Sequence, residues 1–515
     1  FDSLEVFNDN PGWGYYNDDI PGGPPRGSNR HWVLGDWFNL LNRGYRYTAV
    51  GNSDSHTVYS SYCGWPRNFV ASSTDDPAKI DVAEVADAIR HQRTFTSFGP
   101  FVTYTANGRP MGSDVVAKDG AVTLAIRVQA ASWIDVDRIK IVVNGDVRET
   151  IAVPQTREVV RYDDTRAIDV SRDCWITLLV EGDDALAPIV HDNERPTRPL
   201  AVMNPVWVDA DGGGWVSPWV QAQQFATAIK KENWRATYDS LAPHERGLLA
   251  LAAAETPSPV AGDVIAAALG GELSTAMMAA RAAERYRRAP VLDAVRDALD
   301  HADNAYLQVA LIRALADQSG TNDERIVTFV ESAPPETRER YGEELTRHLP
   351  GGFVREWAVI GYFPNDRGEG LRRTFGPEQG VDVSASYEGK QGKHVRWQPL
   401  TAGADGYLDL RQIGQSRSAY ENAVAYAATQ LRCEEAREIA YAVGTDDGCR
   451  VWLNGALVHD DPTRHGATPL QHVGRLKLRS GLNTLIIKVE NGRSRFGLYF
   501  RILDNAVSES PLIRR

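Results

Sequence analysis

The 515-residue chain has little cysteine, only Cys63, Cys174, Cys433 and Cys449. Four cysteines are too few to form a disulfide scaffold in a protein of this length, and their spacing matches no zinc motif. Cys433 and Cys449 are compatible with a disulfide across neighbouring strands in an oxidising compartment. Two unrelated buried thiols are the favoured interpretation.

The sequence also lacks long apolar runs and an excess of positive charge. No stretch approaches the roughly 18 apolar residues that a membrane span needs, and no signal peptide is visible. The formal net charge is −12, so non-specific binding to nucleic acid is not expected. The chain opens at Phe1 without Met, in what resembles the middle of a strand. We therefore expect an N-terminal portion to be missing.

The length and the hydrophobic periodicity predict a multidomain α+β protein with four parts. Residues 1–98 are predicted to be α/β, with strands at Leu4–Phe7 and Tyr45–Val50 and helices at Trp32–Leu41 and Val82–Gln92. Gly44 is the expected C-terminal cap of the first of these helices. Polar residues that follow a strand, as 51–56 do here, are where α/β folds usually carry their chemistry.

The remaining three parts differ in their periodicity. Residues 99–216 alternate with period two, which predicts a small antiparallel β-sandwich with a hairpin turn at Asn144-Gly145. Residues 217–350 contain Ala-rich amphipathic runs, which favour paired helices in an α-solenoid of HEAT type, although no clean repeat is present. Residues 351–515 return to alternating strands, which predicts a β-sandwich with jelly-roll topology.

Asp54 and His56 are the strongest chemical signal in the sequence. Two residues apart on an extended loop after a strand, their side chains can point the same way. A carboxylate and an imidazole together suit a divalent cation such as zinc, manganese or iron, but a site usually needs three or four protein ligands. From spacing alone, a polar turn with a capping Asp54 is the favoured alternative.

The surrounding residues resemble the end of a PHP (polymerase and histidinol phosphatase) domain, most closely the CehA/McbA-type hydrolases. The motifs that carry this resemblance occur in the family's order: Leu4-Glu5-Val6-Phe7-Asn8, Trp37 to Gly44, Tyr47 to Thr57, Gly64-Trp65-Pro66-Arg67-Asn68, Ala88-Ile89-Arg90, Arg93 to Pro100, Asn107-Gly108 and Gly112-Ser113. The resemblance covers roughly the first 115 residues and, more loosely, the stretch to about Pro205.

The resemblance implies a distorted (β/α)₇ barrel with a cluster of two or three metal ions. The last metal-binding motif of the family, Asp-X-His, falls on Asp54 and His56. Arg67 is expected to hold an anionic group of the substrate, the alternative being a surface ion pair. Glu5 is compatible with an outer carboxylate or with a structural role. The family's early His-X-His motif and bridging Glu have no counterpart, and His31 and His91 lack the neighbours those motifs need. We therefore expect an incomplete active site.

Two further segments have acidic turns. Asp209-Ala210-Asp211-Gly212-Gly213-Gly214 begins like a calcium loop, but Gly213 replaces a ligand and no Glu follows at position twelve. A Gly-rich linker is the simpler interpretation. In the C-terminal part, 357–365, 445–455 and 482–489 resemble galactose-binding-like sandwiches and lectin domains of the anthrax protective-antigen type.

That second resemblance implies carbohydrate or calcium binding through Asp446, Asp447, Trp452 and Asn454. The alternative, favoured by turn chemistry, is two hairpin turns with Trp452 in the core. The sequence thus predicts a PHP-type hydrolase of phosphoesters, esters or carbamates. The alternative is a non-catalytic carbohydrate-binding or scaffold protein. Accessory sandwiches slightly favour a secreted or periplasmic bacterial protein.

Overall fold

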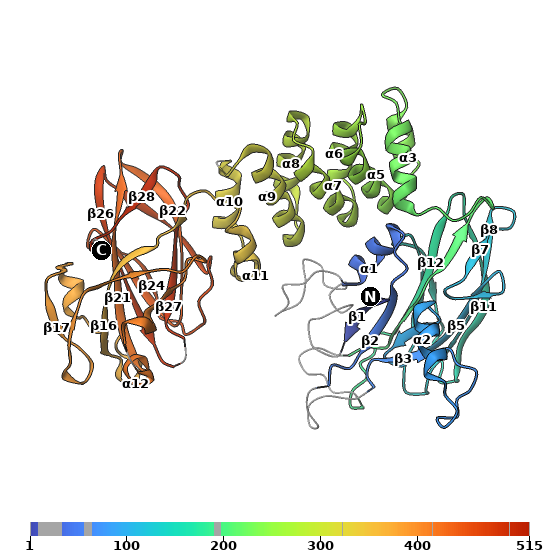
Figure 1. Cartoon of the computed structure of the whole chain (residues 1–515), viewed down its shortest axis with the longest axis horizontal. Helices are drawn as coiled ribbons and strands as arrows, with labels where there is room; N and C mark the ends of the chain where they lie inside the picture. Colours follow the sequence, from blue (N-terminus) through green and yellow to red (C-terminus); the bar gives the residue numbers. More distant parts are fainter. Residues whose placement is uncertain are drawn as a thin grey trace. The chain divides into compact units, whose positions relative to one another are not determined.

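The computed structural model describes residues 2–8, 33–55, 64–189, 197–321, 323–414, 416–493 and 495–513. The chain forms two compact units, Phe1–Leu311 and Ile312–Arg515. Each unit combines helices with mostly antiparallel sheets (Figure 1), as predicted for a multidomain α+β chain with β-sandwiches. No helix among the described residues is both long and apolar enough to cross a bilayer.

The first unit opens with two parallel strands, β1 (Ser3–Asn8) and β2 (Thr48–Asn52), connected through α1 (Val33–Asn42). The apolar face of α1 is buried. Gly44 has a φ of 91° and caps α1 as predicted. The amide of Tyr45 still bonds back to the carbonyl of Leu40, at 3.0 Å, in the closing turn of α1. Strand β2 therefore starts three residues later than the sequence predicted.

An eight-stranded sheet joins the first predicted region to the second. Its main path runs β10-β9-β12-β13-β4-β3, and β14 pairs with both β12 and β7. Its strands are β3 (Arg67–Val70), β4 (Thr94–Ser97), β7 (Asp114–Val116), β9 (Arg138–Val143), β10 (Asp146–Ala152), β12 (Cys174–Glu181), β13 (Leu200–Met203) and β14 (Val206–Asp209). Helix α2 (Val82–Arg90), capped by Asp81, connects β3 to β4. Residues 1–98 thus contribute β3 and β4 to the same sheet as strands of 99–216.

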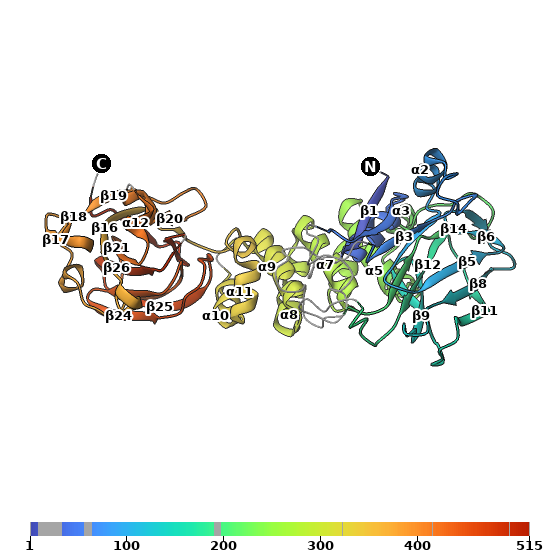
Figure 2. The same cartoon turned by 90° about the horizontal axis from the view of Figure 1, so that it is seen from below.

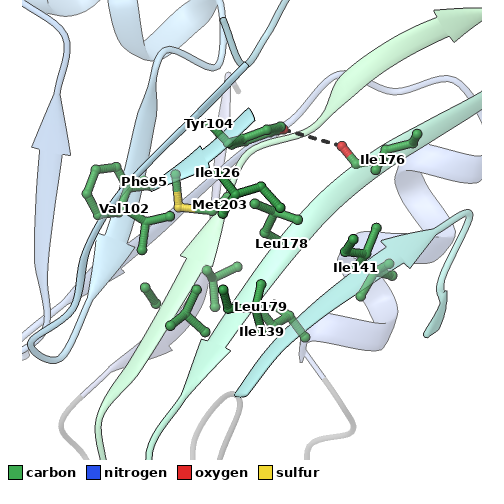
Figure 3. Packing of buried hydrophobic residues seen from close by; sticks show 14 of the residues in the cluster. Phe95, Val102, Tyr104, Ile126, Ile139, Ile141, Ile176, Leu178, Leu179 and Met203 are labelled. Carbon is green, nitrogen blue, oxygen red and sulfur yellow. Dashed lines mark hydrogen bonds between the residues drawn. The ribbon is translucent and has the colours of Figure 1, made fainter. Parts of the chain in front are cut away.

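A four-stranded sheet packs against this sheet. It has the order β11-β8-β5-β6 and consists of β5 (Phe101–Ala106), β6 (Arg109–Pro110), β8 (Ala121–Gln129) and β11 (Val160–Asp169). Figure 3 shows the core, in which Val102 and Ile126 meet Ile139 and Leu178. The buried Tyr104 hydroxyl donates to the carbonyl of Asn204 at 2.6 Å and lies 3.3 Å from the carbonyl of Ile176.

The helical region follows, and it contains helices beyond the Ala-rich runs of the sequence. Its helices are α3 (Pro218–Ala228), α4 (Trp234–Asp239), α5 (Pro243–Glu255), α6 (Ala261–Leu269), α7 (Leu273–Arg285), α8 (Ala289–His301), α9 (Ala305–Ser319), α10 (Glu324–Ser332) and α11 (Pro335–Leu345). Helices α5, α7 and α8 lie side by side in both views (Figure 1 and Figure 2). Their buried alanines allow close packing of neighbouring helices.

The second unit contains a β-sandwich. Its larger sheet has the order β19-β16-β21-β26-β23-β24, with β28 beside β21, and its smaller sheet β15-β27-β22-β25, with β20 beside β27. The larger sheet comprises β16 (Glu356–Pro364), β19 (Gln398–Thr401), β21 (Ala423–Cys433), β23 (Cys449–Leu453), β24 (Ala456–Asp461), β26 (Gly481–Asn491) and β28 (Val507–Ser510). The smaller sheet comprises β15 (Gly352–Phe353), β20 (Leu408–Asp409), β22 (Arg437–Thr445), β25 (His472–Leu478) and β27 (Gly497–Ile502).

Two apolar cores stabilise this sandwich. One lies between the sheets, and the other packs on the outer face of the larger sheet. Strands β17 (Ser386–Glu388) and β18 (His394–Arg396) pair separately, and α12 (Arg417–Tyr420) is a single turn. Cys433 and Cys449 are free and buried, as is Cys174, so the favoured interpretation of unpaired thiols is confirmed.

Candidate functional site

The carboxyl ends of β1 and β2 lie together because the two strands are parallel and paired. Glu5 lies on β1, and Asn52 ends β2. The Asn52 amide donates a hydrogen bond of 2.8 Å to the Glu5 carboxylate. This contact joins a carboxylate of one strand to the start of the loop that carries Asp54. Glu5 is thus engaged in positioning the loop.

A second contact fixes the backbone where that loop begins. The Asn68 side chain, on β3, donates to the carbonyl of Gly51 at 2.8 Å and accepts from its amide at 3.0 Å. One side-chain amide thus satisfies both polar groups of one residue, as a neighbouring strand would. The first residues of the loop are therefore tied to both β1 and β3.

Asp54 is partly exposed and has a φ of 45°, in the left-handed region. Aspartate tolerates this conformation better than most residues, and it is common at sharp turns. His56, its predicted partner, lies outside the described residues. The pairing of these two side chains therefore stays a prediction.

Arg67 is exposed at the start of β3. Its guanidinium carbon lies 4.5 Å from the centre of the Trp65 ring. Stacking on an aromatic ring holds the flat guanidinium in one orientation and leaves its N–H groups available. This arrangement suits the recognition of an anion, but a role for Arg67 in catalysis stays a prediction.

The C-terminal acidic turn follows β22. Asp446 is buried, and burial together with the neighbouring Asp447 raises its pKa above the usual value. Asp447 has a φ of 44°, and its carboxylate accepts a 2.6 Å hydrogen bond from the amide of Gly492. Asp447 therefore organises the backbone of the turn, whereas Asp446 lies next to a second carboxylate.

Trp452 and Asn454 lie toward the other end of β23 from this acidic turn. Trp452 is half-buried and packs on the outer core of the larger sheet. The Asn454 amide accepts from the amide of Thr484 at 3.0 Å and donates to the side chain of Asn483 at 2.9 Å. The structure therefore divides the four predicted residues between two ends of one strand.

Two groups of described residues bring three metal-ligand side chains within 4.8 Å of one another. The first consists of Asp209 and Asp211, from the segment that resembled a calcium loop, and of Asp173, which directly precedes β12. The carboxylates of Asp173 and Asp209 accept hydrogen bonds of 2.7–3.3 Å from backbone amides, and these bonds lower the pKa of Asp209. The acidic side chains thus shape the linker by binding its own N–H groups.

The second group is His459, Asp461 and His472, which sequence reasoning missed. A signal was present, since three of the eleven histidines occur between 459 and 472. Their spacing matches no familiar motif, and only the fold brings them together.

No family model matches the chain, and no curated protein matches it. Solved structures with local similarity include an anti-sigma factor domain-containing protein (14% identity, 30% of this chain, 44% of that chain, TM-score 0.21). Another is the PA14 domain of the MpAFP antifreeze protein (14% identity, 17% of this chain, 52% of that chain, TM-score 0.14). A third is a family 35 carbohydrate binding module from an environmental isolate (14% identity, 19% of this chain, 83% of that chain, TM-score 0.15). The chain spans about half the length of the first two. TM-scores this low carry no functional argument.

Proposed function

We propose that residues 1–98 form the C-terminal part of a PHP-type hydrolase domain, in which Asp54 and His56 bind a divalent metal ion. The observation that carries this proposal is the parallel pair β1–β2, whose carboxyl ends meet beside the Asp54 loop. Open α/β folds place their ligands at this edge. The series of PHP-like motifs, which occur in the family's order, supports the assignment of this loop as a metal-binding loop.

The chain's own residues have distinct roles in this proposal. Glu5, through Asn52, and Asn68, through Gly51, hold the start of the ligand loop. Arg67, oriented by Trp65, binds a negatively charged group of the substrate. A bound zinc, manganese or iron ion would lower the pKa of a bound water and polarise the phosphoester, ester or carbamate.

Asp54 and His56 supply two ligands, and a metal site usually has at least three from the protein. The PHP resemblance assigns the others to segments that precede this one in the family, as parts of a (β/α) barrel. In the same proposal, the helices of 217–350 are a HEAT-like solenoid that acts as a spacer, and 351–515 is a galactose-binding-like jelly roll.

The test is hydrolysis by the longest gene product that contains this sequence. Aryl phosphate, carboxylester and carbamate substrates are assayed after chelation and after reconstitution with zinc, manganese or iron. We expect metal-dependent turnover that Asp54→Ala and His56→Ala reduce by about 100-fold or more, whereas the exposed Asp75→Ala retains it. Equal turnover in all three variants would exclude the Asp54 loop as the active site.

The alternative is a non-catalytic carbohydrate-binding or scaffold protein. One observation favours it: Asp446 is buried beside Asp447, and a calcium ion there would offset the charge. Millimolar calcium should then raise the melting temperature of the chain, but not of Asp446→Asn, and a glycan array should show binding. Without either result, 446–447 form a turn only.

A further inference from the structure

Four metal-ligand side chains meet where the C-terminal sandwich changes sheets. His459 and Asp461 lie two residues apart on β24, an edge strand of the larger sheet. His472 begins β25, an edge strand of the smaller sheet. His465 lies on the connection between them. The group therefore spans the edges of both sheets.

One oxygen of Asp461 is the centre of the group. Its Oδ2 lies 2.6 Å from Nε2 of His465 and 2.9 Å from Nε2 of His472. A ligand atom of His459 lies within 4.8 Å of those of Asp461 and His472. Ligand atoms around a tetrahedral zinc ion are about 3.3 Å apart, given bonds of about 2.0 Å. Three of the four side chains are thus close to this spacing, and His465 joins them through its contact with Asp461.

Two of the imidazole nitrogens are buried without a hydrogen bond. Nε2 of His459 is shielded from solvent and hydrogen-bonds to no residue that the structure describes. Nε2 of His472 is shielded as well, and it lies 2.9 Å from Oδ2 of Asp461 without the geometry of a hydrogen bond. Leaving such a nitrogen unsatisfied destabilises the fold, so a buried polar atom of this kind needs an explanation. A bound cation would satisfy both nitrogens at once.

The second nitrogen of His465 is oriented as in known metal sites. Its Nδ1 lies 3.1 Å from the carbonyl of Thr445, which can only accept a hydrogen bond. Nδ1 therefore carries a proton. Nε2 faces the Asp461 carboxylate at 2.6 Å, so a proton or a cation must lie between these two atoms, and loss of that proton would leave a lone pair for a metal. Metal-binding histidines usually hold their other nitrogen in this way.

We propose that His459, Asp461, His465 and His472 form a binding site for a structural zinc ion in the second unit. Three imidazoles and one carboxylate match the ligands that zinc prefers, and four protein ligands leave no open position for catalysis. The ion connects β24 to β25 and so joins the edges of the two sheets. This site is independent of the Asp54 loop.

The charges around the group fit one divalent cation. Asp460 is engaged by Arg450, with contacts of 2.9 and 3.0 Å, so Asp461 is the carboxylate available to a metal. Arg338 is the nearby positive group, and it is held by the carbonyl of Leu470 at 3.2 Å. The competing arrangement is a metal-free network in which charged imidazoles share the Asp461 carboxylate.

The test compares the whole chain with His459→Gln/His472→Gln and with His394→Gln, an exposed histidine of the same unit. Each protein is stripped with EDTA, dialysed against zinc and analysed by mass spectrometry. We expect the double variant to lose one zinc per chain and the control to lose none. The pair is also made with Asp54→Ala, so that loss of this site is distinguished from loss at the Asp54 loop.

A second measurement needs no variant. Cobalt(II) added to the stripped chain should give the intense visible absorption of a tetrahedral site, and zinc should displace it. Zinc should also raise the melting temperature of the chain and of the His394→Gln control. Equal zinc content in the chain and in the double variant would establish the metal-free network instead. So would a visible spectrum that shows only the aqueous hexahydrate of cobalt(II).

Discussion

The side-chain nitrogen of Asn42 donates a hydrogen bond to Nε2 of His244 across 2.6 Å, which joins α1 to α5. The assignment follows from the partners. Trp175 Nε1, which can only donate, lies 2.8 Å from Oδ1 of Asn42, so the other end of that amide is the nitrogen. This nitrogen also donates to the carbonyl of Asn144 at 2.9 Å. His244 is therefore neutral, with Nε2 as the acceptor.

Replacing Asn42 with alanine should destabilise the first unit by about 2–4 kcal/mol. The variant leaves the buried Trp175 N–H and the His244 nitrogen without their partner, and unsatisfied buried groups are costly. Urea unfolding followed by tryptophan fluorescence measures the change. Asn39→Ala, at an exposed position of the same helix, is the control and should change stability by less than about 0.5 kcal/mol. Similar values for both variants would contradict the network's role.

His244 should make the first unit acid-sensitive between pH 6.5 and 4. Burial lowers the pKa of His244 to about 4, so in this window the unfolded chain binds a proton that the folded chain does not. Stability therefore falls as the pH falls, by roughly 3 kcal/mol over the window. His244→Gln lacks this term.

The measurement is the stability difference between the wild type and His244→Gln at pH 7 and pH 4. It should shrink by about 3 kcal/mol on acidification. Asp146, whose pKa burial raises to about 6, contributes the opposite slope, but it does so in both proteins. A pH-independent difference would mean that His244 is not held neutral by the fold.

Lys488 is fully buried and should be replaceable only together with Glu378. Its ammonium lies 2.8 Å from the Glu378 carboxylate and donates to the Arg373 carbonyl at 2.6 Å. Lys488→Met leaves that carboxylate buried without its cation and should cost about 3–5 kcal/mol. Lys488→Met/Glu378→Gln should recover part of the loss, because Tyr426 can still donate to the glutamine. The exposed Lys477→Met is the control, and a cost below about 1 kcal/mol for Lys488→Met would refute this account.

The hydrophobic periodicity of the sequence was sufficient to predict most of the individual helices and strands that it was used to predict. The helix predicted at Trp32–Leu41 is α1 (Val33–Asn42), and the helix predicted at Val82–Gln92 is α2 (Val82–Arg90). Asn144 and Gly145 have φ values of 53° and 105°, as a primed hairpin turn requires. Local backbone preferences and the spacing of apolar residues determine these features, so a short stretch of sequence is enough to predict them.

Contacts between distant residues could not be predicted in the same way. Asn204 bonds to both backbone groups of Ala49 and to the carbonyl of Thr94, and nothing local marks it for this role. Lys488 lies on β26, and nothing in the neighbouring sequence marks it for burial. A second core covers the outer face of the larger sheet, so the lysine is buried. The zinc ligands His459 and His472 likewise come from different sheets.

Substitution of Arg67 tests how the proposed hydrolase binds its substrate. Arg67→Lys keeps the charge but loses the planar fork and the stacking on Trp65, so kcat/KM for anionic substrates should fall about 10-fold or more. Neutral esters should be affected much less. Arg90→Lys, at another exposed arginine, is the control. Equal kinetics of both variants on anionic substrates would show that Arg67 does not bind the substrate.

The most direct measurement of the central claim is the metal content of the longest gene product, as isolated, against its Asp54→Ala variant. Both are prepared with the His459→Gln/His472→Gln substitutions, so that zinc in the second unit does not contribute. The account predicts that the parent retains zinc, manganese or iron and that Asp54→Ala loses at least one ion per chain, since a metal site seldom survives loss of a carboxylate ligand. A full and equal metal complement in both proteins would contradict it.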